Sequence, residues 1–238
     1  MAAEGQNEKT IVFVLYPGLT VFDLTGPLQV FTALSRIAPE YRTVVLAERL
    51  KPTATDIPGA LKVLPNATFA EVPHPFAFIV PGGAGPTLRA LHNEAIRAYV
   101  RSAAETAEVV GSVCTGALIL ASVGLLEGRR ATTHWAFYKV LEQFGATYVR
   151  QRWVEDGKFI SSAGVSAGID MALQLAARLT DEHTAREVQF QLGYDPDPPF
   201  GGIDYDHIGG QLGMWRAAVS LAAPVIAAKP KRLTSQGR

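Results

Sequence analysis

The chain alternates short, fully apolar runs with longer stretches in which apolar residues recur every three or four positions. The short runs predict buried strands, and the longer stretches predict amphipathic helices. Strands are expected at residues 11–16, 42–47, 76–80, 109–113, 147–154 and 158–162, with a short extra strand at 61–64. Helices are expected at residues 22–34, 93–106, 115–123, 134–144, 166–179, 181–192 and 211–223. In the first of these, Gly26 and Pro27 indicate that the regular helix begins near residue 26.

This alternation predicts an α/β fold. Parallel strands need crossover connections, and the helices in those connections cover both faces of the sheet. We therefore expect a mostly parallel sheet with helices on both faces, formed by residues 10–203. Residues 204–238 are expected to add a helical extension and a basic tail, with the tail at 229–238 a disordered, solvated end. The segment 194–202 is rich in Pro and Asp and is expected to be irregular.

An uncharged stretch of eighteen residues between Glu108 and Glu127 just reaches the length of a membrane-spanning helix. Its first part is β-branched, its second part is rich in Ala and Leu, and glycines interrupt it. We interpret the stretch as a buried strand that leads into a buried helix. No membrane contact is therefore expected.

Charge and cysteine content narrow the possible partners. The 22 basic and 22 acidic side chains leave no net charge, which argues against a nucleic-acid-binding protein with a basic face. The polar start of the chain lacks the pattern of a secretion signal, which favours the cytoplasm. One cysteine cannot form an internal disulfide, and the five histidines show no metal-ligand spacing. With no phosphate-binding glycine motif either, we expect no metal and no cofactor.

Ligands of open parallel sheets bind beyond the carboxyl ends of the strands, and one residue there is a cysteine. Cys114 lies between a predicted strand and a predicted helix, with Gly111 before it and Gly116 after it. This is the setting of a nucleophile elbow, and the positive end of the helix favours a thiolate with a lowered pKa. The alternative is a buried structural cysteine that packs as a small hydrophobic residue.

Three other strand ends carry candidate residues. Asp23, flanked by apolar residues, is either a helix cap or a carboxyl group with a raised pKa that can donate a proton. Gly82 and Gly83 offer backbone N–H groups of the kind that form an oxyanion hole, or an ordinary turn. Ser166 lies in a G-x-S-x-G sequence, but we interpret it as a helix cap, since no later buried strand carries a catalytic histidine. His134 at a predicted helix start is either structural or close to the site.

Together these motifs resemble the ThiJ/PfpI superfamily of class I glutamine-amidotransferase-like proteins, and within it the isonitrile hydratase branch. The resemblance covers about residues 10–200 and is carried by DLTGP at 23–27, VPGG at 80–83, SVCTG at 112–116, ATTHW at 131–135 and AGVSAGID at 163–170. It implies a flavodoxin-like three-layer sandwich, a small-molecule substrate and a homodimer. It also implies that Cys114 is the nucleophile and Asp23 its partner carboxyl group.

The resemblance further implies roles for neighbouring residues. Gly83 and Thr115 are expected to direct backbone N–H groups at the reacting atom, and His134 and Val165 to lie around the reactive pair. Protease and amidase members carry His directly after the cysteine. Thr115 stands there in this chain, which disfavours peptidase activity.

The activity that this resemblance implies is the hydration of an isonitrile to an N-substituted formamide through a covalent thioimidate on Cys114. Three alternatives remain open: a glyoxalase or deglycase, an oxidation switch, and a ligand sensor. Some regulators of the superfamily join this domain to a helix-turn-helix module. The chain is expected to be too short after the domain for the usual pair of such modules.

Overall fold

The computed structural model describes residues 8–228 of the 238-residue chain. The basic tail predicted at 229–238 lies outside the described residues. The strands are β1 Lys9–Val14, β2 Tyr41–Ala47, β3 Thr53–Ala54, β4 Lys62–Val63, β5 Ala67–Thr68, β6 Ala77–Val80, β7 Val109–Val113, β8 Arg130–Ala131, β9 Thr147–Tyr148, β10 Trp153–Asp156 and β11 Phe159–Ser162. The helices are α1 Val21–Ile37, α2 Gly85–Ala90, α3 Glu94–Thr106, α4 Gly116–Ser122, α5 Tyr138–Gln143, α6 Ala167–Leu179, α7 Glu182–Gln191 and α8 Gly210–Ala227.

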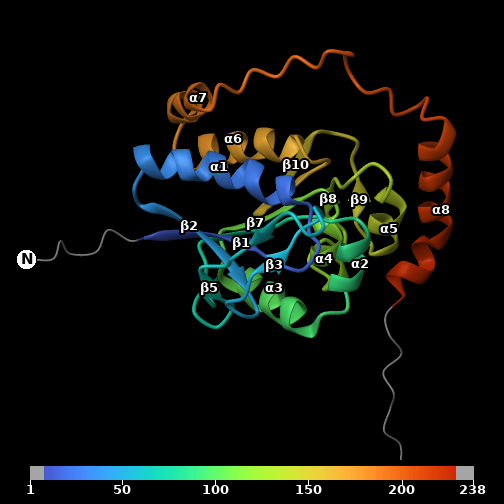
Figure 1. Ribbon diagram of the computed structural model, residues 1–238, viewed down its shortest axis with the longest axis horizontal. Helices are drawn as coiled ribbons and strands as arrows, with labels where there is room; N and C mark the ends of the chain where they lie inside the picture. Colours follow the sequence, from blue (N-terminus) through green and yellow to red (C-terminus); the bar gives the residue numbers. More distant parts are fainter. Residues whose placement is uncertain (1–7, 229–238) are drawn as a thin grey trace, which may run out of the picture.

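Seven strands form one central sheet in the order β10-β11-β7-β6-β1-β2-β5. All neighbouring pairs are parallel except β10 and β11, which form an antiparallel hairpin at one edge. Helices α1 and α6 lie on one side of the sheet, and α3 and α4 lie on the other (Figure 1). The predicted three-layer α/β sandwich is confirmed.

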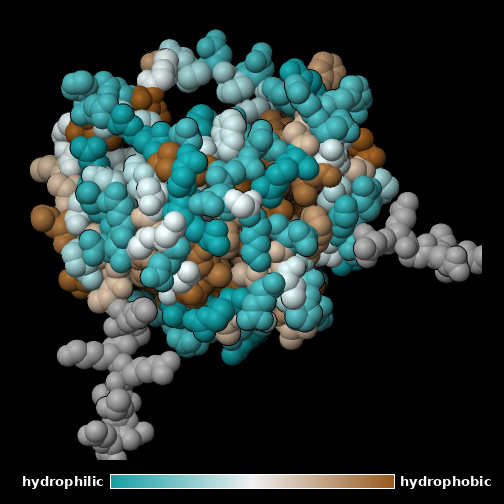
Figure 2. Space-filling view, turned by 180° about the vertical axis from the view of Figure 1, so that it is seen from behind, coloured by the Kyte–Doolittle hydropathy of each residue, from teal (hydrophilic) through white to brown (hydrophobic). Residues whose placement is uncertain are grey.

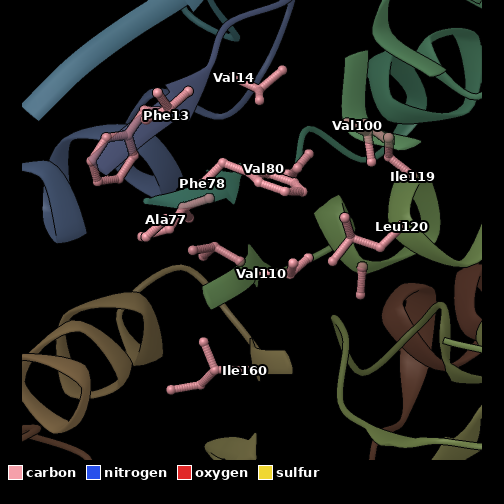
Figure 3. Packing of buried hydrophobic residues seen from close by; sticks show 14 of the residues in the cluster. Phe13, Val14, Ala77, Phe78, Val80, Val100, Val110, Ile119, Leu120 and Ile160 are labelled. Carbon is pink, nitrogen blue, oxygen red and sulfur yellow. The ribbon is translucent and has the colours of Figure 1, made fainter. Parts of the chain in front are cut away.

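The core lies where the central strands are covered on both faces. Residues of β1, β6, β7 and β11 pack with residues of α3 and α4 (Figure 3). Every residue of β7 is buried, as expected for a parallel strand between two helical layers. The uncharged stretch between Glu108 and Glu127 is thus strand β7 followed by the buried helix α4, as predicted. In residues 8–228, no helix combines the length and apolarity needed to cross a membrane.

Three predicted boundaries are wrong, and in the first a tertiary contact outweighs a local signal. Helix α1 begins at Val21 and continues through Pro27, although this proline lacks the N–H that would bond within the helix. It is held by close packing, since a Cβ added at Gly26 would lie 3.1 Å from the Ile169 side chain of α6. Helix α5 begins only at Tyr138, and residues 147–154 are divided between β9 and β10.

The parallel arrangement brings four loops to one edge of the sheet. The ends of β1, β6, β7 and β11 lead into residues 17–23, 81–85, 114–116 and 163–168. These loops carry the residues that the sequence singles out. The edge formed by the carboxyl ends of the strands is therefore the place to examine for a site.

Candidate active site

Cys114 occupies a strained turn between β7 and α4. Its φ is +57°, in the left-handed region that only Ala84 shares among the other non-glycine residues of 8–228. Two hydrogen bonds fix the turn: the Cys114 N–H donates to Ser162 O at 2.9 Å, and Thr133 Oγ1 donates to Cys114 O at 2.9 Å. Strain of this kind is concentrated at functional sites. The local geometry is that of a nucleophile elbow.

Two glycines let the neighbouring backbones come close to this turn. A Cβ at Gly116 would lie 2.0 Å from Val80 O, and one at Gly82 would lie 2.6 Å from the Thr115 nitrogen. Both distances are too short for any side chain. Only glycine fits at Gly82 and Gly116, because the loops after β6 and β7 contact each other through their backbones.

Asp23 is fully buried at the start of α1. Thr20 is the N-cap of that helix, so the interpretation of Asp23 as a cap is wrong. Asp23 Oδ2 accepts a hydrogen bond from Gly82 N–H at 3.1 Å, whereas Oδ1 has no hydrogen-bond partner in residues 8–228. Burial raises the pKa of Asp23 from 3.8 to about 7, against the opposing effects of Cys114 and Gly82 N–H. Asp23 therefore changes charge near neutral pH, as the other interpretation requires.

The Cys114 thiol behaves differently from the expectation. Burial, followed by the negative charge of Asp23, raises the pKa of the thiol, and the Thr115 backbone N–H only partly opposes this. The predicted lowering of the pKa by α4 is thus wrong, because the cost of burying an anion outweighs the field of this seven-residue helix. The sulfur is a neutral thiol at rest. The fold brings the Asp23 carboxyl group to this elbow, since a Cβ at Gly82 would lie 2.6 Å from Thr115 N and 2.8 Å from Asp23 Oδ2.

Thr115 links the elbow to the glycine loop through its side chain. Thr115 Oγ1 accepts hydrogen bonds from Gly83 N–H at 3.0 Å and from Ala84 N–H at 3.1 Å. The Gly83 N–H therefore contacts Thr115 in this structure, and its action on a reacting atom stays a prediction. The Thr115 N–H is near Cys114, since it affects the pKa of the thiol.

A chain of buried hydroxyl groups that the sequence analysis missed holds Thr115 in place. Thr115 Oγ1 lies 2.8 Å from Thr87 Oγ1, which lies 2.9 Å from the Tyr16 hydroxyl. Tyr16 donates its one proton to Pro81 O at 2.9 Å, so Thr87 must donate to Tyr16 and Thr115 must donate to Thr87. The available signal was Tyr16 itself, because a tyrosine in an otherwise apolar run needs a partner for its hydroxyl.

Replacement of Thr115 by Val is expected to destabilise the protein by roughly 2–4 kcal/mol, because it leaves the N–H groups of Gly83 and Ala84 without an acceptor and removes the hydrogen bond that Thr115 donates to Thr87. Thr115→Ser keeps the hydroxyl and should stay within about 1 kcal/mol of the wild type. Denaturant unfolding measures both differences. Equal stability of the two variants would contradict the assigned hydrogen bonds.

A cavity of about 890 Å³ lies next to the elbow. Thr133, His134 and Val165 line it, as does Phe22, the neighbour of Asp23. Cys114 and Asp23 lie behind this wall: the cysteine is 5% exposed and the aspartate is not exposed. Neither residue is among those that line the cavity.

His134 lies in this wall with its ring against Trp135, Phe137 and Trp215. Burial lowers the pKa of His134 to about 4, so the ring is neutral at physiological pH. Its Nδ1 accepts a hydrogen bond from Ala136 N–H at 3.3 Å, which leaves the proton on Nε2. The placement of His134 and Val165 beside the elbow is compatible with the predicted roles around the reactive pair, which stay predictions.

Ser166 is not an elbow. Its φ is −70°, an ordinary helical value, and it is the N-cap residue of α6, as predicted, although its side chain makes no capping hydrogen bond. Within residues 8–228, no group of three or more His, Cys, Asp or Glu side chains is placed to hold a metal ion. The reactive groups that the sequence singles out and the fold places at the elbow are the sulfur of Cys114 and the carboxyl group of Asp23.

Several known proteins are similar to this chain in sequence and in fold. The sequence model of the DJ-1/PfpI family matches residues 9–178. Isonitrile hydratase from Pseudomonas putida is 41% identical over 190 residues, which are 80% of each chain. The HTH-type transcriptional regulator CdhR from Pseudomonas aeruginosa is 32% identical, over 76% of this chain and 54% of the regulator. The crystal structure of a ThiJ/PfpI family protein from Pseudomonas syringae superimposes with a TM-score of 0.81 at 32% identity, covering 96% of this chain and 98% of that one.

Proposed function

The chain belongs to the DJ-1/PfpI family, and on that premise we propose that it is an isonitrile hydratase, which converts an isonitrile and water to an N-substituted formamide. The observation that carries the proposal is the buried pair of Cys114 and Asp23 at the strained elbow. The similarity to the Pseudomonas putida isonitrile hydratase supports the same activity.

In the first step, the Asp23 carboxylate takes the proton of the Cys114 thiol as the isonitrile approaches. The sulfur attacks the terminal carbon of R–NC, and Asp23 delivers the proton to the same carbon. The product is the thioimidate R–N=CH–S–Cys114, with Asp23 again a carboxylate. The thiolate exists only during this transfer, which suits a sulfur whose resting pKa is raised.

In the second step, Asp23 removes a proton from a water molecule that adds to the thioimidate carbon. Asp23 delivers this proton to the nitrogen, and the tetrahedral intermediate R–NH–CH(OH)–S–Cys114 collapses to R–NH–CHO as Asp23 takes the proton of its hydroxyl group. The sulfur leaves and recovers its proton through Asp23. We assign the Thr115 N–H, which already acts on the sulfur, to hold charge that develops there, and Gly83 to keep Thr115 in position.

The geometry of the site disfavours some of the alternative functions and leaves others open. An oxidation switch needs an exposed thiol of low pKa, and the buried Cys114 with a raised pKa disfavours it. Thr115 in place of a histidine after the cysteine disfavours an amidase. A glyoxalase or deglycase, and a ligand sensor without turnover, are separated from the hydratase only by assay.

The test incubates the protein with 4-nitrophenyl isocyanide and follows the corresponding formamide by chromatography. We expect catalytic formamide production, and acid quenching should trap an adduct of the isonitrile on the peptide that contains Cys114, detected by mass spectrometry. Methylglyoxal serves as the competing substrate under the same conditions. Turnover of methylglyoxal without formamide, or saturable binding without any product, would contradict the hydratase.

The homodimer, the cytoplasmic location and the division at residue 203 stay predictions. Light scattering of the purified protein measures its mass in solution and so tests the homodimer. A mass of twice 25.5 kDa is the expected result.

A further inference from the structure

The cavity beside the elbow is much larger than an isonitrile group requires. Its volume of about 890 Å³ lies in the upper part of the roughly 300–1,000 Å³ found for sites that hold drug-sized ligands. The group that reacts has only two atoms. Most of the cavity must therefore serve the rest of the substrate, the R of R–NC.

Six aromatic side chains contribute to the wall of this cavity. They come from α1, the loop before α5, α5 itself, β9 and the C-terminal segment, and they are Phe22, His134, Trp135, Tyr138, Tyr148 and Tyr205. Such rings stack on flat, apolar groups. The lining therefore fits an aromatic body better than a short alkyl chain.

Three arginines also line the cavity, and two of them are already paired. Arg150 binds both oxygens of Asp206, at 2.5 and 3.3 Å, and Arg152 binds Asp170. Each of these guanidinium groups is thus neutralised by a carboxylate. Neither is expected to bind an anion of the substrate strongly.

Arg216 differs from the other two. Its Nη1 donates to Tyr205 O at 3.2 Å, and no carboxylate of residues 8–228 forms an ion pair with it. It acts electrostatically on Asp206, but that carboxylate is held by Arg150. Asp204, the other acid of the wall, is engaged with His207 Nδ1 at 2.7 Å. Arg216 therefore presents a positive charge whose remaining N–H groups have no assigned acceptor.

We propose that the cavity takes an aryl isonitrile that carries a carboxylate, and that the Arg216 guanidinium binds this carboxylate. The proposal rests on the proposed hydratase function and names the substrate class of the same site. A planar guanidinium and a carboxylate match in shape and form two parallel charged hydrogen bonds. The aromatic wall then holds the ring, and the isonitrile group points to the Cys114 elbow.

The part of the chain that supplies Arg216 supports a role in specificity. Arg216 lies in α8, and Ile203, Tyr205 and Ile208 of the preceding segment also line the cavity. All of these residues follow the region 9–178 that matches the family. Figure 1 shows the extended connection from α7 that crosses the molecule and brings α8 beside α5, and Figure 2 shows an opening beneath this connection. The C-terminal segment thus adds a wall to a site whose reactive residues belong to the common domain.

The test compares 4-isocyanobenzoate with its methyl ester, which has the same ring and isonitrile but no charge. In the wild type we expect kcat/KM for the acid to exceed that for the ester by at least about tenfold. Arg216→Gln should lower kcat/KM for the acid by about 10- to 100-fold, mostly through KM, and change that for the ester less than about threefold. Arg216→Lys should retain part of the preference.

Arg186→Gln is the matched control, since Arg186 is exposed on α7, pairs with Glu182 and does not line the cavity. It should leave both substrates unaffected. An equal loss for acid and ester in Arg216→Gln, or a wild type without preference, would overturn the proposal. If neither substrate gives formamide, the proposed function fails instead. Calorimetric binding of 4-formamidobenzoate to the wild type and to Arg216→Gln then still tests the anion site, and equal affinity would refute it.

Discussion

Cys114→Ser is expected to lower kcat/KM for isonitrile hydration by roughly 10³-fold or more. A hydroxyl group is a far weaker acid than a thiol, and a carboxylate whose pKa is about 7 cannot deprotonate it. No thioimidate then forms, so the adduct on the peptide with residue 114 should also disappear. Steady-state assay of the formamide and mass spectrometry of the quenched protein give the two readouts.

Two controls make this result specific to the sulfur. Cys114→Ser changes one atom at a site that is 5% exposed, and its thermal unfolding should stay within a few degrees of the wild type. Ser166→Ala tests the competing G-x-S-x-G motif and should lose less than about tenfold, because Ser166 has ordinary helical backbone geometry and is no elbow. Substantial hydration by Cys114→Ser would refute covalent catalysis by this residue.

Asp23→Asn is expected to lower kcat/KM by about 10²–10⁴-fold, the usual contribution of a general acid–base group. The wild type needs Asp23 as a carboxylate, so its kcat/KM should fall tenfold per pH unit below about pH 7. The residual activity of Asp23→Asn should lack this dependence. A pH profile of both proteins with an uncharged isonitrile measures the difference, and an unchanged acid limb in the variant would assign the titration to another group.

Asp56→Asn is the matched variant for this profile. Asp56 raises the pKa of Asp23 through its charge, and its Oδ1 accepts a hydrogen bond from Val21 N–H at 2.9 Å, which an asparagine oxygen can also accept. Removal of this charge should move the midpoint of kcat/KM to lower pH and leave the plateau unchanged. A shift to higher pH would contradict the assigned electrostatics.

Ionisation of the buried Asp23 is expected to lower the free energy of unfolding. The pKa of Asp23 is about 7 in the folded protein, above the ordinary value of 3.8, so the folded state holds this proton more tightly than the unfolded state. The resulting stabilisation is fully present below about pH 4 and is lost as pH rises through 7. Asp23→Asn should therefore be more stable than the wild type at pH 8, by up to roughly 4 kcal/mol, while the two should converge at pH 4. Denaturant unfolding at both pH values measures this. A variant less stable than the wild type at pH 8 would show that the buried charge is compensated.

The elements of the fold could be predicted closely from the sequence where hydrophobic pattern and burial agree. The run at 109–113 is strand β7 itself, since a strand covered on both faces must be apolar throughout. The predicted start of α1 was wrong because packing supplies the stabilisation there. Helix α1 passes through Pro27 because α1 and α6 pack closely at Gly26, and no local signal contains that contact.

The candidate site was predicted in part. Cys114 and Asp23 follow strands whose carboxyl ends meet at one edge of a parallel sheet, so their types and positions made them candidates before the structure placed them side by side. The hydroxyl chain from Thr115 through Thr87 to Tyr16 was missed, because its members are far apart in the sequence. The role of the C-terminal segment was missed because a single helix pattern does not show which cavity the helix closes.

The sequence by itself determined the layers of this protein, the strand ends that carry reactive groups and the identity of those groups, because periodicity and residue type are local properties. Only the tertiary structure decided the protonation state of the pair. Burial of Cys114 and Asp23 together raises the pKa of both, and burial depends on every element packed around them. The thiolate predicted from one helix end is for that reason a thiol at rest, which in the proposed mechanism loses its proton to Asp23 only as the substrate approaches.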